Sequence, residues 1–119
     1  MPTLNLSPPS VPQRLREMLK DYPEHVERLQ EVLTPFAVPK TRFMPFDEAT
    51  WALEGRLESF INEAREELAI AEASGDTTTL ERAKVKLDLM FDARSRNFGG
   101  LHDLEELWNY FQINKEAFE

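Results

Sequence analysis

The chain has 119 residues, of which 41% are hydrophobic and 30% charged, with no cysteine and a formal net charge of -8. This length fits one domain with its own core, and the lack of cysteine excludes disulfides, thiolate metal sites and cysteine nucleophiles. The negative charge disfavours nucleic acids and anionic membranes as partners, because a polyanion repels an acidic protein that has no strong basic patch.

The first residues predict neither a secretory signal nor a membrane anchor. The sequence MPTLNLSPPS has no cationic start and no apolar run of signal-peptide length. No run of about 18 apolar residues follows. We therefore expect a soluble cytoplasmic protein with a mobile N-terminal arm over residues 1–9 and one helical domain over residues 10–119.

Two short helices are predicted next, each with a capping pattern and a proline in its first turn. Ser10 and Gln13 have capping-box spacing before a helix over residues 10–20, and the same pattern precedes a second helix over residues 23–34. Apolar residues recur at helical spacing in both segments. Each helix is therefore expected to bury one stripe in a common core.

The stretch PFAVPKTRFMPF, residues 35–46, contains three prolines and three phenylalanines. Proline lacks the amide donor that a helix interior needs, so we predict an extended, proline-rich crossover here. The stretch is too apolar for a flexible linker. We expect three aromatic rings to plug the core and two cations to stay in water. The expected plugs are Phe36, Phe43 and Phe46, and the cations are Lys40 and Arg42.

The two longest helices are predicted over residues 48–74 and 79–97. Their apolar residues alternate steps of three and four, as in a coiled-coil seam, and Gly75 with Asp76 supplies a short connection. These helices are therefore expected to form an antiparallel αα-hairpin. Surface ion pairs are expected between Glu63, Glu66 or Glu67 and Arg82, Lys84 or Lys86.

A final helix is predicted over residues 102–113, with Trp108 among the apolar residues that mark it. No segment alternates long enough to form a strand. The predicted fold class is all-α: a single-domain helical bundle of about five helices, built around the long antiparallel αα-hairpin.

Catalytic and metal sites are weakly indicated. His102 and Glu105 lie one helical turn apart, but the second Glu-His pair of a di-metal bundle is missing. Ser95, His102 and Asp103 have the residue types of a triad without a nucleophile elbow, and Gly99–Gly100 lacks the pattern of a phosphate-binding loop. The sequence therefore predicts a non-enzymatic protein with no cofactor and no metal.

Two acidic surfaces are candidates for binding a partner. One is a carboxylate cluster on the long helix, for which a merely solvated face is the alternative interpretation. The other combines carboxylates with an aromatic residue at the start of the last helix, a mixture typical of interfaces. The first comprises Glu63, Glu66 and Glu67, and the second comprises Asp103, Glu105, Glu106 and Tyr110.

These surfaces favour a protein-protein interaction protein whose partner has a basic surface, such as an inhibitor or an immunity or antitoxin protein. The crossover offers an alternative contact loop, made of Lys40, Arg42, Phe43 and Met44. A second hypothesis is a self-associating structural or regulatory subunit, for instance a homodimer. Its contact stripe would contain Trp51, Ile61 and Ile70.

Overall fold

A computed structural model of the chain describes residues 6–95 and 104–119. Within these ranges the structure contains five α-helices, two short 3-10 helices and no strand, which confirms the all-α prediction. In chain order the elements are α1 (Gln13–Met18), α2 (Pro23–Leu33), η1 (Thr34–Ala37), α3 (Pro45–Ser74), α4 (Thr77–Arg94), α5 (Glu105–Ile113) and η2 (Lys115–Phe118).

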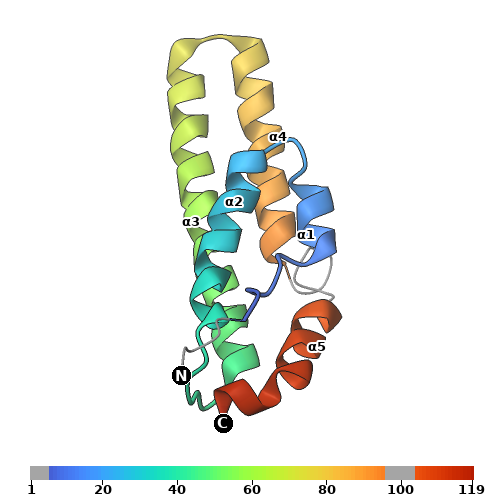
Figure 1. Cartoon of the computed structure of the whole chain (residues 1–119). Coiled ribbons are helices and arrows are strands. Elements are labelled where there is room, and N and C mark those ends of the chain that lie inside the picture. The colour runs from blue at the N-terminus through green and yellow to red at the C-terminus, as the bar shows by residue number, and fades with distance from the viewer. Residues whose placement is uncertain (1–5, 96–103) are drawn as a thin grey trace.

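The antiparallel hairpin of α3 and α4 runs along the long axis of the molecule (Figure 1). The molecule measures 60 × 29 × 22 Å along its three principal axes. Gly75 ends α3 with a φ of 74°, a left-handed conformation that glycine adopts without a steric penalty. The Asp76 carboxylate then accepts the Thr78 main-chain N–H at 3.1 Å and the Thr79 hydroxyl at 2.7 Å. This cap starts α4 two residues before the predicted start, and the hairpin itself is confirmed.

The core lies where shorter helices cover one part of this hairpin. Helix α2 packs on α3, α1 packs on α4, and α5 packs on α3. Burial of each large apolar side chain in this core stabilises the fold by about 1.5–3 kcal/mol. The largest fully buried side chains include Leu15, Leu19, Leu29, Leu33, Leu53, Leu57, Phe60, Met90 and Leu107.

The tip of the hairpin extends beyond α1 and α2 (Figure 1). Within the hairpin the small side chains Ala71 and Ala83 are buried, while Ile70 and Val85 are 71% and 65% exposed. Ile61 is 5% exposed and belongs to the core, so the predicted self-association stripe is wrong for this residue.

The two predicted capping boxes near the N-terminus are wrong. Helix α1 begins at Gln13 after Pro12, α2 begins at Pro23 after Tyr22, and neither has a side-chain cap. A proline at or beside the first helical position has no amide to satisfy and its φ already suits a helix. The prolines therefore mark these starts better than the polar residues do.

Residues 6–9 lie against the bundle, unlike the mobile arm predicted over residues 1–9. The Leu6 main-chain N–H donates to the Ala37 carbonyl oxygen at 2.8 Å. The Gln30 side-chain amide donates to the Pro9 carbonyl oxygen at 2.9 Å, and Pro9 is buried. These bonds satisfy main-chain groups that an unattached arm would leave to water.

The crossover departs from its prediction at both ends. Residues 34–37 form η1, and α3 begins at Pro45 rather than at residue 48. Phe36 is buried as expected and Phe46 is half-buried, but the plug prediction is wrong for Phe43, which is 93% exposed. Arg42 is also misplaced by the prediction, because its side chain is largely buried instead of lying in water.

Candidate protein-binding surfaces

The predicted carboxylate cluster of α3 does not form one open acidic face. Glu63 accepts two hydrogen bonds from the Arg28 guanidinium, at 2.8 and 2.6 Å, which joins α3 to α2 instead of α4. These bonds lower the pKa of the Glu63 carboxyl and raise the pKa of Arg28. Glu67 pairs with Lys86 at 2.9 Å, as predicted. Glu66 is exposed and forms no ion pair within the described residues.

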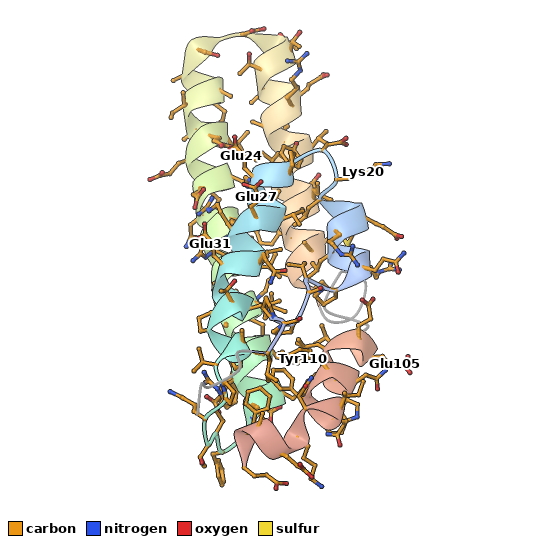
Figure 2. The ribbon with its side chains drawn as sticks, in the orientation of Figure 1. Lys20, Glu24, Glu27, Glu31, Glu105 and Tyr110 are labelled. Carbon is orange, nitrogen blue, oxygen red and sulfur yellow. The ribbon has the colours of Figure 1, made fainter. Side chains whose placement is uncertain are left out.

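The predicted surface at the start of α5 is also divided. The Tyr110 hydroxyl donates to the Ser7 carbonyl oxygen at 2.7 Å, and burial raises the pKa of this phenol. Glu106 accepts the Gln13 main-chain N–H at 3.1 Å, which links α5 to α1. Two members therefore hold the fold together. Glu105 lies on the other side of α5 from Tyr110 (Figure 2), and Asp103 falls outside the described residues.

A third acidic group runs along α2. Glu24, Glu27 and Glu31 are exposed and follow one another along this helix (Figure 2). Of the three, Glu31 pairs with Arg56 of α3 at 3.4 Å. We refer to these three residues as the α2 acidic stripe. Their spacing of three and four residues is visible in the sequence and is the signal that predicts a shared helix face.

The end of the molecule opposite the hairpin turn carries a groove between the crossover and the C-terminal elements. Its volume is about 420 Å³, and we refer to it as the basal groove. It brings the predicted contact loop next to α5 and η2, although Lys40 does not line it. The lining residues are Arg42, Phe43, Met44, Pro45, Phe46, Asp47, Trp108, Phe111, Gln112, Lys115, Phe118 and Glu119.

Aromatic rings form both the floor and the rim of the basal groove. Phe111 and Phe118 are buried and pack with their centroids 5.2 Å apart. Trp108, one of the apolar residues that mark the last helix in the sequence, is 48% exposed, and its ring meets Phe46 edge-on with centroids 5.2 Å apart. Phe43 is nearly fully exposed beside them. Fixed rings below and accessible rings above favour contact with another molecule.

The charges around the basal groove differ in whether they are already paired. The Arg42 guanidinium lies 4.2 Å from the Phe36 ring centroid and pairs with Glu48 at 3.1 Å. Its Nε is buried and has no hydrogen-bond acceptor within the described residues. Asp47, in the first turn of α3, is half-buried and forms no ion pair with any described residue. Lys115 is exposed at the start of η2.

The other sequence candidates yield no assembled site in the described part of the chain. No three His, Asp or Glu side chains of residues 6–95 and 104–119 gather as metal ligands. His102, Asp103, Gly99 and Gly100, which belong to the weakly indicated triad, metal pair and glycine pair, fall outside these ranges. None of the helices in the same ranges has the length and apolar character required to cross a bilayer.

Comparison with known proteins gives no family. The chain matches no protein-family model, no curated protein and no solved structure. The interpretation of the basal groove therefore depends on its own geometry and chemistry.

Proposed function

We propose that the chain is a non-enzymatic protein-binding protein that docks through the basal groove onto a partner with a basic surface. The observation that carries this proposal is the 93% exposure of Phe43 beside a groove floored by aromatic rings. Burying such a ring would stabilise the folded state by about 1.5–3 kcal/mol, and the exposed Phe43 does not contribute this stabilisation. Exposed aromatic side chains at the edge of an apolar hollow are typical of binding hot spots.

The segment that presents Phe43 is held in place, which favours binding. The Arg42 main-chain N–H donates to the Phe118 carbonyl oxygen at 2.9 Å, and the Thr41 hydroxyl donates to the Glu119 main-chain oxygen at 2.9 Å. The Met44 N–H donates to the Glu48 carboxylate at 3.2 Å. A segment ordered before binding loses less conformational entropy when it docks, so more of the contact energy becomes affinity.

Electrostatics supports a basic partner. The net charge of -8 and the exposed α2 acidic stripe produce a negative field that accelerates encounter with a positively charged surface. Occupying that surface would neutralise whatever the partner does with it, and this is the route by which the chain would act as an inhibitor.

Affinity capture with matched variants tests the proposal. Phe43→Ala removes the most exposed ring that lines the groove, and Trp51→Ala removes a ring that is 53% exposed on α3 but does not line the groove. We expect a protein that is retained by the wild type and by Trp51→Ala, released by salt, and lost with Phe43→Ala. The proposal is contradicted if no captured protein depends on Phe43.

A second candidate function is self-association through the tip of the hairpin. The specific observation is the exposure of Ile70 on α3 and of Val85 on α4, the two helices whose hairpin extends beyond α1 and α2 (Figure 1). A second copy would bury both side chains. Sedimentation at tens of micromolar should then show a dimer for the wild type and a monomer for Ile70→Lys. A wild-type monomer at that concentration excludes this function.

A further inference from the structure

We infer that the basal groove receives an arginine side chain presented by the partner, seated against the exposed aromatic rings and facing Asp47. This inference rests on the proposed function, because it names the group that the partner inserts. Three observations on the described residues carry it: two accessible rings with no cation over them, a carboxylate with no ion-pair partner, and an arginine of the groove that is already neutralised.

The rings at the rim, Phe43 and Trp108, are of the kind that cations stack on elsewhere in this fold. Four cations of the described residues each lie over an aromatic ring within about 6 Å, the distance at which the ring quadrupole attracts them. In the same part of the chain, none lies over Phe43 or Trp108, although both rings are accessible. The occupied pairs are Arg28 over Phe60 at 4.7 Å, Arg42 over Phe36 at 4.2 Å, Arg65 over Phe91 at 5.3 Å and Lys86 over Tyr22 at 5.1 Å.

Asp47 favours a cation over an apolar side chain as the occupant. It lines the groove and has no ion-pair partner among the described residues. An aliphatic or aromatic side chain entering the groove would take this carboxylate out of water without compensation, which is unfavourable. A guanidinium would stack on the rings and also donate to the carboxylate, since its planar fork suits both contacts.

In the part of the chain that the structure describes, neither of the two cations that line the groove, Arg42 and Lys115, pairs with Asp47. Arg42 already pairs with Glu48 and packs on Phe36, so its charge is matched inside the protein. Lys115 is exposed on η2 and pairs with no carboxylate of the described residues. A like charge at the edge of the groove weakens binding of an incoming cation, so Lys115→Gln is expected to strengthen it.

Selection from a random twelve-residue peptide display library tests the inference, because it requires no identified partner. Peptides are selected on the wild-type protein and counter-selected on Phe43→Ala, whose circular dichroism verifies the fold. We expect groove-dependent peptides that contain arginine beside apolar residues. Replacing that arginine by the neutral isostere citrulline should weaken binding at least tenfold, Asp47→Asn should weaken it several-fold, and Lys115→Gln should strengthen it.

The outcomes separate this inference from the proposed function. Groove-dependent peptides without a cation, or peptides that bind equally well with citrulline, overturn the arginine site while the groove remains a protein-binding surface. If no peptide depends on Phe43, both the arginine site and the proposed docking surface are wrong.

Discussion

Phe36 and Phe43 belong to the same aromatic stretch, yet one is 5% and the other 93% exposed. Phe36 sits in η1 directly after α2, where it meets Phe111 edge-on with centroids 5.6 Å apart. Phe43 follows Arg42, whose side chain turns inward to Phe36 and Glu48. The two neighbouring side chains therefore have opposite environments, Arg42 largely buried and Phe43 in solvent.

This difference explains why composition alone misassigns Phe43. Three phenylalanines in a row of prolines indicate a buried plug, because apolar side chains favour the interior. Which neighbour turns inward depends on the Glu48 carboxylate and the Phe36 face, which only the folded chain brings to Arg42.

The ion pair between Arg28 and Glu63 predicts a loss of stability in acid. The folded-state pKa of Glu63 is lowered from 4.5, so the unfolded chain binds the proton more readily. The stabilisation is therefore fully present above pH 4.5 and is lost as the pH falls through the folded-state pKa. Both side chains are partly exposed, which limits the effect to less than about 1 kcal/mol.

Urea denaturation of Glu63→Gln and of the control Glu66→Gln, from pH 7 to pH 3, measures this contribution. At pH 7 we expect Glu63→Gln to have the lower free energy of unfolding, and the gap between the variants should close in acid. A gap that stays constant across this range would show that the ion pair contributes no net stability.

Among the elements, the hairpin could be predicted because its signals are local and agree with one another. The apolar seam, the glycine stop and the acidic cap all lie within or beside the two helices. The start of α2 at Pro23 agrees with the prediction, whereas the starts of α1 and α3 differ from it, because proline both ends a preceding segment and opens a helix. The short η1 helix is not predicted either, because Pro35 lies in its first turn and indicates the end of the preceding helix.

One glycine within α3 and one at its C-terminal cap predict stability changes of opposite sign. Gly55 lies within the helix, and a methyl group added there meets no atom within 4 Å, so Gly55→Ala should stabilise by about 0.5–1 kcal/mol. Gly75 has a φ of 74°, so Gly75→Ala should destabilise by about 1 kcal/mol or more. Thermal unfolding of both variants checks the signs. Equal effects would contradict the assigned roles of the two glycines.

At the scale of the whole molecule, the basal groove joins residues 42–47 to residues 108–119. The sequence predicts a contact loop and a final helix separately, but no local pattern shows that a crossover and a C-terminal helix meet. The pairing depends on long-range bonds, such as the bond from the Arg42 N–H to the Phe118 carbonyl. Another long-range bond joins the Tyr110 hydroxyl to the Ser7 carbonyl oxygen, so Tyr110, a predicted contact residue, is used within the fold.

The central claim is that Phe43 serves binding and contributes little to folding. Its most direct test is to measure, for Phe43→Ala, both the free energy of unfolding and the affinity for a captured partner or a selected peptide. We expect unfolding to change by less than about 0.5 kcal/mol, as for a surface position, while Kd rises at least tenfold, as for a hot spot. A loss of about 3 kcal/mol in stability, or an unchanged Kd, would contradict the claim.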